Sequence, residues 1–216
     1  MLRFGRLLGA LLVLAGLAMV AWTLAVWRWE DPFTSLYTAY EQRKLDSSLD
    51  DRFATFGVST DTPASARRFR RSARIGEGIG RIEVPRLGLR MVLVFGTTHD
   101  ALKRGPGLDP RTHFPGENRL VYVAGHRTTY SAPFSKIDSV RRGDEIRLEM
   151  PYGTFTYAVT GSRIVAASDV SVLRSKLFEQ VVLQACHPRF FASERWLTYG
   201  RLVRAVPPAP GAESEG

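Results

Sequence analysis

Cys186 is the side chain best suited to covalent chemistry, because it is the only cysteine in the 216-residue chain. It follows the apolar run 181–185 and precedes a His-Pro pair. A thiol with an ordinary pKa near ~8.5 is only a few per cent ionised at neutral pH, so a nucleophilic cysteine needs a base or a cation beside it. A lone cysteine is more often a small buried apolar residue, and this interpretation stays open on residue type alone.

Two histidines and two arginines are candidate partners for the thiol. His126 comes directly after a short predicted strand, whereas His187 adjoins Cys186 and would point to the opposite face of its strand. Arg195 lies at the start of the last predicted strand, just before its first residue, and offers a fixed cation for a developing oxyanion, while Arg189 lies in the middle of a loop. The spacing therefore predicts an acyl-transfer site made of Cys186, His126 and Arg195.

The elements that must position these residues are β-strands. Residues 75–206 alternate short β-rich runs with turns of Gly, Pro and Asp. The predicted strands are 80–84, 90–95, 119–124, 145–150, 154–164, 181–185 and 198–204. Seven or eight short strands with little helix predict an all-β domain closed into a barrel or sandwich, with His126 and Cys186 at one rim.

The N-terminal segment 7–27 has 21 residues without a charge, which is long enough for a helix of roughly 30 Å to cross a bilayer. Arg3 and Arg6 precede it, so we expect residues 1–6 in the cytoplasm and the rest of the chain outside. A cleaved signal peptide is the alternative, although its apolar region would be shorter, roughly 7–15 residues. An extracytoplasmic domain has no nucleic-acid partner, despite the net charge of +9.

Between the anchor and the β-rich domain the sequence predicts two segments. Residues 28–56 carry apolar side chains at helical spacing and predict a stem helix with Asp31 as its N-cap. This helix is expected to pack on its own protein rather than on a partner. Residues 57–74, rich in Ser, Thr, Pro and Arg, predict a flexible basic linker, and the tail 207–216 is expected to be disordered.

Several segments together resemble a sortase, and most closely the class E-like sortases of actinobacteria. They are AGHRTTYSAPF (124–134), ACHPRFFASERW (185–196), RIEVPRLGL (81–89), GPG (105–107), PGEN (115–118) and RRGDEIRL (141–148). The resemblance implies an eight-stranded sortase-type β-barrel as the catalytic domain, 75–206. It further implies Cys186 as nucleophile, His126 as general acid/base and Arg195 as a clamp for the oxyanion or the substrate.

The resemblance also implies the reaction and its partners. A sortase cleaves an LPxTG- or LAxTG-like C-terminal sorting signal of a secreted protein and transfers the acyl group to a cell-wall peptide amine through a thioacyl-cysteine. Tyr130, Thr128 and Ala185 are then expected to contact substrate, with no cofactor and no metal. Val182 and Ala185 replace the threonines of the usual TLxTC signature, and loss of one donor costs on the order of 10²–10³ in rate.

Four alternatives remain at this point. A pilin-polymerising sortase carries a lid motif similar to the DPF at 31–33, and a membrane-tethered barrel could bind peptides with weak or no catalysis. An L,D-type cell-wall transpeptidase would have Gly directly before the cysteine, where this chain has Ala185. A metal site would need the scattered histidines, which form no HxH or HxxxH pair: His99, His113, His126 and His187.

Overall fold

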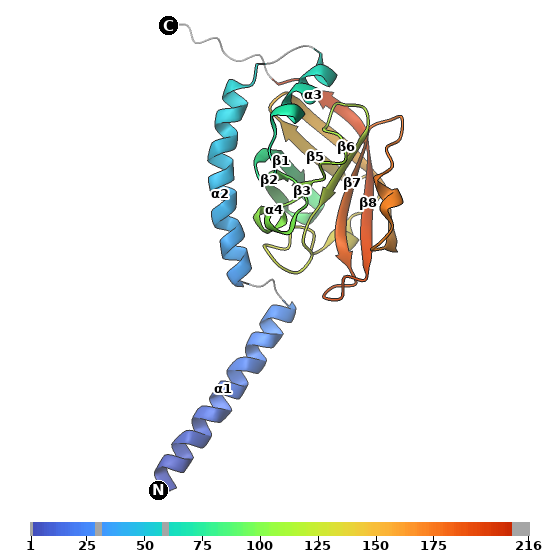
Figure 1. The fold of residues 1–216 in the computed structure, drawn as a ribbon. Helices are drawn as coiled ribbons and strands as arrows, with labels where there is room; N and C mark the ends of the chain where they lie inside the picture. The colour runs from blue at the N-terminus through green and yellow to red at the C-terminus, as the bar shows by residue number, and fades with distance from the viewer. Residues whose placement is uncertain (1, 29–31, 58–60, 209–216) are drawn as a thin grey trace, which may run out of the picture.

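A closed β-barrel forms the body of the molecule, with helices on its outside (Figure 1). The computed structural model describes residues 2–28, 32–57 and 61–208. The barrel order is β1-β2-β3-β4-β7-β8-β6-β5. The strands are β1 (Gly78–Val84), β2 (Leu89–Phe95), β3 (Gly107–Leu108), β4 (Leu120–Ala124), β5 (Glu145–Met150), β6 (Gly153–Ala166), β7 (Gln180–His187) and β8 (Glu194–Val206). The expected all-β, eight-stranded barrel is confirmed.

Two of the strands differ most from the sequence prediction, and the others agree with it to within two residues at each end. The two-residue strand β3 was expected as part of a loop, because its Gly-Pro-Gly surroundings are typical of a turn. It pairs parallel with β2 and antiparallel with β4, and so closes the barrel between them. Strand β8 begins at Glu194, four residues before the predicted start at Thr198. The longer strand matters because it brings Arg195 into the β-ladder.

Strand β7 buries apolar side chains on both of its faces. Leu183 and Ala185 belong to the core inside the barrel, whereas Val182 packs on the outside. The outer cluster is completed by residues of β4, β8 and the connection between β6 and β7: Leu120, Tyr122, Leu197, Val172 and Leu173. The continuous apolar run of β7 thus reflects burial on two sides, and the alternation along the strand turns Cys186 outward.

The chain has four α-helices in its described parts: α1 (Leu2–Arg28), α2 (Pro32–Thr55), α3 (Thr62–Ser72) and α4 (His99–Arg104). The segment Gly5–Leu24 of α1 is long and apolar enough to cross a membrane, and none of it is buried against the protein. The predicted N-cap Asp31 lies outside the described residues, as does most of the predicted tail.

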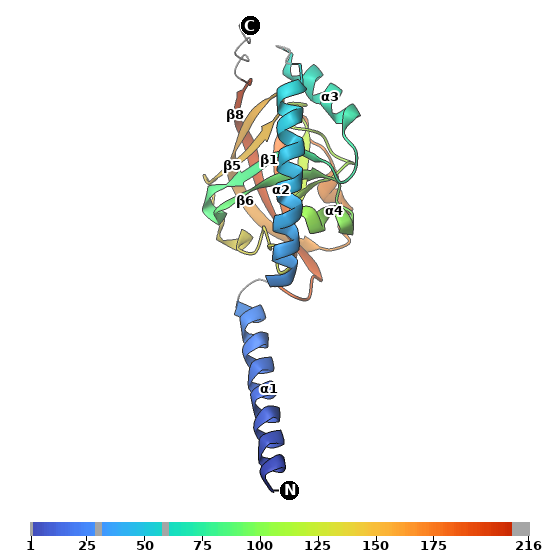
Figure 2. The same ribbon diagram turned by 90° about the vertical axis from the view of Figure 1, so that its left-hand side faces the viewer.

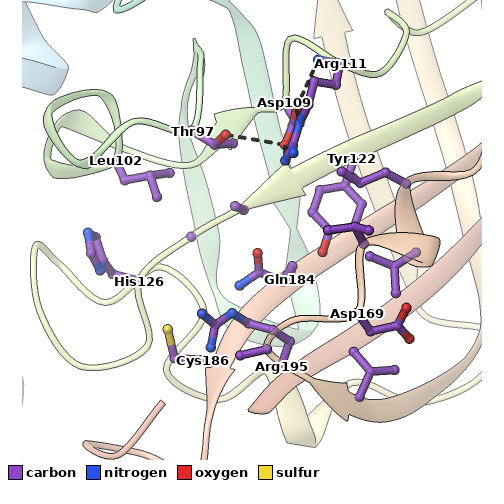
Figure 3. A pocket seen from close by; sticks show the side chains of 17 residues that line it. Thr97, Leu102, Asp109, Arg111, Tyr122, His126, Asp169, Gln184, Cys186 and Arg195 are labelled. Atoms are coloured by element: carbon purple, nitrogen blue, oxygen red, sulfur yellow. Dashed lines mark hydrogen bonds and ion pairs between the residues drawn. The ribbon is translucent and has the colours of Figure 1, made fainter. Parts of the chain in front are cut away.

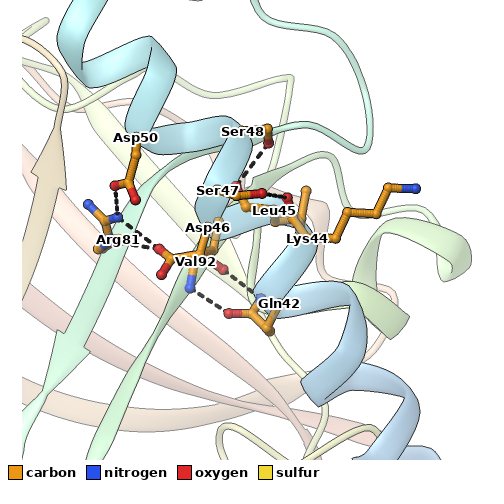
Figure 4. A network of polar contacts seen from close by, with 9 residues as sticks. All are labelled: Gln42, Lys44, Leu45, Asp46, Ser47, Ser48, Asp50, Arg81 and Val92. Atoms are coloured by element: carbon orange, nitrogen blue, oxygen red, sulfur yellow. Dashed lines mark hydrogen bonds and ion pairs between the residues drawn. The ribbon is translucent and has the colours of Figure 1, made fainter.

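Helix α2 runs along the side of the barrel, as Figures 1 and 2 show from two directions. Leu45 and Leu49 of α2 are buried against Val92 and its neighbours on β2. The Gln42 amide donates to the Val92 carbonyl at 3.1 Å and accepts from the Val92 amide at 2.6 Å (Figure 4). Gln42 therefore satisfies the edge of β2 as a neighbouring strand would. Arg81 of β1 adds ion pairs to Asp46 and Asp50.

The expectation of a flexible linker over 57–74 is wrong for residues 62–72, which form helix α3. The Asp61 carboxylate caps α3 by accepting from the Ala64 amide at 2.9 Å. Ala66 and Phe69, three residues apart, are buried in the barrel core. The sequence analysis missed this helix because its arginines lie on the outer face and give the segment a polar composition. Two apolar residues at helical spacing are enough to pack it on the barrel.

Replacing Phe69 with Ala tests whether α3 is part of the folded domain. Phe69 is 2% exposed and packs against Phe56, Phe114 and Tyr152, so the truncation should cost about 3–5 kcal/mol of unfolding free energy. Thermal unfolding of the full chain in detergent should show a melting temperature lower by about 10 °C. The exposed Arg67→Ala variant is the matched control, and equal melting temperatures for the two variants would contradict the docking of α3.

Candidate active site

The pairing of β7 with β8 places Cys186 directly opposite Arg195. Cβ atoms of opposed antiparallel residues lie roughly 4.5–5.5 Å apart on the same face of the sheet. For this pair the face is the outer one, because the preceding residue, Ala185, belongs to the interior core. A thiol and a cation are thereby brought together by backbone hydrogen bonding alone.

Cys186, His126 and Arg195 line one pocket of about 320 Å³ on the outer face of the barrel (Figure 3). The structure therefore brings together the three residues that the sequence predicts as catalytic. The remaining walls come from β4, β6, β7, the β6–β7 connection and the segment between β2 and β4, and include Tyr122, Gln184, Val165, Asp169 and Leu173. The thiol is partly exposed, so a substrate can reach it.

The Arg195 guanidinium is held by two backbone carbonyls at the β7–β8 loop and the first residue of β8. Its Nη1 donates to the carbonyls of Ala192 at 2.7 Å and Glu194 at 2.8 Å. Both bonds are made by Nη1. The other guanidinium nitrogens, Nε and Nη2, remain available to the pocket that Arg195 lines. A cation held in this way can stabilise an oxyanion that forms beside the Cys186 sulfur.

His126 reaches the pocket because β4 lies parallel to β7. The ladder continues past its last pair, with the Gly125 amide donating to the Gln184 carbonyl at 3.0 Å. Gly125 has no room for a side chain, since a Cβ would lie 2.6 Å from the Phe134 ring. A glycine at this point thus lets the Phe134 ring pack directly against the backbone that leads into the histidine loop.

Aromatic rings enclose the His126 imidazole. Ring centroids of Tyr130 and His99 lie 5.1 Å and 6.5 Å from it. Its Nε2 is buried and has no hydrogen-bond partner among the residues that the structure describes. Burial lowers the pKa of His126, and the electrostatic interaction with His99 lowers it further. An imidazole held neutral with a free nitrogen is suited to accept and return a proton.

The loop after His126 is strained. Tyr130, Ser131 and Ala132 follow one another with φ of 54°, 59° and 35°, a left-handed run without a glycine. Each such residue costs on the order of 1–2 kcal/mol. The conformation lays the Tyr130 ring against His126, so Tyr130 reaches the site through the histidine and is not itself among the pocket-lining residues. Thr128 also does not line the pocket, and is partly buried in the same loop.

Ala185 does not contact the pocket, contrary to the expectation that it binds substrate. Its side chain is fully buried in the barrel core, because successive residues of β7 alternate between the two faces. A threonine hydroxyl at this position would therefore point away from the Cys186 thiol, and the rate penalty expected from its absence has no structural basis. His187 also faces away from the thiol, as predicted, and contacts Arg127 and Trp196.

The sequence analysis missed the polar end of the pocket. Asp109 is buried and accepts from Arg111 at 2.7 Å and 3.0 Å, with Thr97 nearby at 3.4 Å. Burial alone would raise the pKa of Asp109, but the hydrogen bonds from Arg111 outweigh it and lower the pKa. Only the Asp-Pro-Arg turn at 109–111 marks this pair in the sequence. In the described residues, no group of three or more His, Cys, Asp or Glu could hold a metal ion.

Comparisons with known proteins agree on one family. The sortase-domain family model matches residues 82–203. Sortase D of Bacillus subtilis (strain 168) is 28% identical over 177 residues, covering 80% of this chain and 87% of that protein. Sortase SrtE1 of Streptomyces coelicolor is 24% identical over 225 residues, covering 95% of this chain and 59% of its relative.

Solved structures give the same result for the fold. The sortase D5 transpeptidase of Clostridium perfringens superposes with a TM-score of 0.66 at 24% identity, covering 76% of this chain and 99% of that one. Sortase E1 from Streptomyces coelicolor, solved with a tripeptide in its active site, gives a TM-score of 0.57 at 25% identity, covering 65% and 99%.

The pKa of His126 can be measured directly. In the full chain in detergent, labelled with ¹³C-histidine, we expect His126 to titrate below the ordinary value of about 6.5. The His99→Gln variant should move the pKa back toward that value, because it removes the electrostatic interaction between the two imidazoles. Since the folded pKa is the lower one, acidification through it costs stability. His113→Gln is the control, and His126→Gln assigns the signal. A wild-type pKa of His126 at or above the ordinary value would contradict the buried environment described for its imidazole.

Proposed function

The chain belongs to the sortase family of cysteine transpeptidases, and on that premise we propose that it anchors secreted proteins to the cell wall. In this proposal it cleaves an LPxTG- or LAxTG-like signal at the C-terminus of its client and transfers the acyl group to a peptidoglycan peptide amine. The observation that carries the proposal is the pocket in which Cys186, His126 and Arg195 meet.

The geometry supports a two-step acyl transfer. His126 takes the proton of the Cys186 thiol, the thiolate attacks the carbonyl of the scissile peptide bond, and Arg195 stabilises the oxyanion that forms. Collapse of this intermediate breaks the C–N bond, and His126 donates a proton to the leaving amine. His126 then takes a proton from the incoming wall amine, which attacks the thioester, and the Cys186 thiolate departs. The departing thiolate takes this proton back from His126, so the thiol proton ends on the leaving amine in the first half-reaction and the proton of the wall amine ends on the thiol in the second.

A class E-like preference for LAxTG-type signals is part of the proposal. The relative solved with a tripeptide in its active site is a sortase E1. In this chain Tyr130 borders the site through its contact with His126, which supports a role for Tyr130 in substrate choice, whereas Thr128 is proposed only from its place in the same loop. The apolar outer cluster beside the thiol supports binding of a peptide that offers aliphatic side chains.

Membrane anchoring is proposed from α1. No part of its apolar segment is buried in the described structure, and Arg3 and Arg6 lie at its start, which supports an N-terminus inside and a barrel outside. A membrane-bound enzyme of this orientation meets both its secreted clients and the wall. This placement leaves no role for nucleic acid, and the mechanism needs no cofactor.

Pilin polymerisation and peptide binding without catalysis are the two alternatives. The lid motif of pilin sortases would put its aromatic residue in the pocket, but Phe33 is 73% exposed and is not among the pocket residues, while Asp31 lies outside the described residues. The outward-facing thiol beside an imidazole and a guanidinium favours catalysis over binding alone.

Transpeptidation by the full chain in detergent tests the proposal. Incubation with LAxTG or LPxTG peptides and a wall-type amine should give the amide-linked product, quantified by chromatography. Cys186→Ala should abolish it, because no other thiol is present. A pilin-derived lysine peptide used as acceptor in preference to the wall amine would instead favour polymerisation. Binding of peptide without turnover would contradict the enzymatic proposal.

Arg195→Lys tests the role of the guanidinium. Lysine keeps the charge but cannot hold both loop carbonyls and reach the oxyanion, so kcat/KM should fall by roughly 10². Arg189→Lys is the matched control, because Arg189 is exposed in the β7–β8 loop and lies outside the pocket lining. Equal activity of the two variants would exclude a specific role for Arg195.

A further inference from the structure

We propose that the first turns of α2 position the catalytic histidine, with Thr34, Ser35 and Tyr37 holding the loop that lays Tyr130 against His126. These three are positioning residues, because they act through Tyr130 and do not touch the reacting atoms. The proposal concerns the geometry of the site, and rests on the proposed function only where activity is the readout.

Three contacts join α2 to the loop. The Tyr130 amide donates to Thr34 Oγ1 at 2.9 Å, and the Ser131 hydroxyl donates to the Ser35 carbonyl at 3.3 Å. The Tyr37 ring packs edge-on against the Tyr130 ring, with centroids 6.5 Å apart. Residues about 96 positions apart in sequence are thus joined by both backbone and side-chain contacts.

The loop needs this support because of its backbone conformation. Tyr130, Ser131 and Ala132 are all left-handed, and none has the freedom of glycine. Such a run persists only when its surroundings restrain it, and the bonds from α2 fall on the first two of its members. Without α2 the run would relax toward ordinary dihedral angles and carry the Tyr130 ring with it.

Movement of Tyr130 would reach His126 directly. Tyr130 is the nearer of the two rings that enclose the imidazole, and its centroid is also 6.3 Å from that of His99. Displacing it opens the buried side of His126 to water and frees the imidazole to turn away from the thiol. The orientation needed for proton transfer is therefore set partly by a helix outside the catalytic barrel.

Helix α2 also holds the second ring of this enclosure, because it is bonded to α4, the helix that begins at His99. Thr38 Oγ1 donates to the Lys103 carbonyl at 2.8 Å, and Glu41 accepts from Arg104 at 2.7 Å. One stem helix thus supports both neighbours of the imidazole. It starts at Pro32, shortly after the apolar helix α1 ends at Arg28, so the supporting contacts lie next to the proposed membrane anchor.

Substitution of Thr34 separates the positioning role from the fold. Thr34→Val keeps the shape but removes the hydroxyl acceptor, whereas Thr34→Ser keeps the hydroxyl and should rescue. In the full chain in detergent, we expect Thr34→Val to speed amide hydrogen exchange at Tyr130 by about fivefold to tenfold, the ratio that loss of one hydrogen bond implies. It should lower kcat by a similar factor and change KM less, since neither Thr34 nor Tyr130 lines the pocket beside the thiol.

A second pair of variants tests the ring contact independently. Tyr37→Ala should shift the NMR signal of the His126 ring and lower kcat, whereas Tyr37→Phe keeps the ring and should do neither.

Melting temperatures of all variants show whether the fold is retained. Unchanged exchange over 126–134 in Thr34→Val overturns the proposal, as does faster exchange with unchanged kcat and an unchanged His126 signal. If the wild type has no transpeptidase activity, the proposed function fails, and the exchange and NMR readouts decide the positioning proposal alone.

Discussion

The antiparallel pairing of β7 with β8 is the constraint on which the rest of the site depends. It sets Cys186 opposite Arg195 and fixes which residues face outward. A slip of one residue would turn the thiol into the barrel core and bring Ala185 out, because side chains alternate along a strand. Burial of β7 on both faces makes such a slip costly, since the inner and outer clusters need different residues. The same packing that stabilises the barrel therefore presents the nucleophile.

His126 depends on a weaker chain of contacts than the Cys186–Arg195 pair. Parallel pairing of β4 with β7 brings the histidine to the same rim, but its loop then leaves the sheet and passes through a strained turn. The turn meets the start of α2, which is itself tied to β2 through Gln42. In this arrangement the sheet holds the nucleophile and the cation, while the base is adjusted by elements packed around the barrel.

Local pattern was enough to predict most strands and the three catalytic candidates, whereas features that depend on long-range packing were not predictable. Cys186 and Arg195 lie in neighbouring strands of one hairpin, so short spacing sufficed. The parallel neighbour of β7 cannot be deduced from spacing, nor can a two-residue strand such as β3. Helix α3 could not be predicted because its arginines outnumber Ala66 and Phe69, the two apolar residues that pack it on the barrel. The inward orientation of Ala185 followed from strand alternation, but the family signature suggested a different role.

The central claim is that Cys186 attacks the carbonyl of a sorting signal, and intact-mass spectrometry of the full chain after incubation with an LAxTG or LPxTG peptide tests it most directly. We predict an adduct of the mass of the acyl fragment, mapped by peptide analysis to Cys186, that disappears when a wall-type amine is added and never forms on Cys186→Ala. An adduct on another residue, or product formation by Cys186→Ala, would contradict the assignment of the nucleophile.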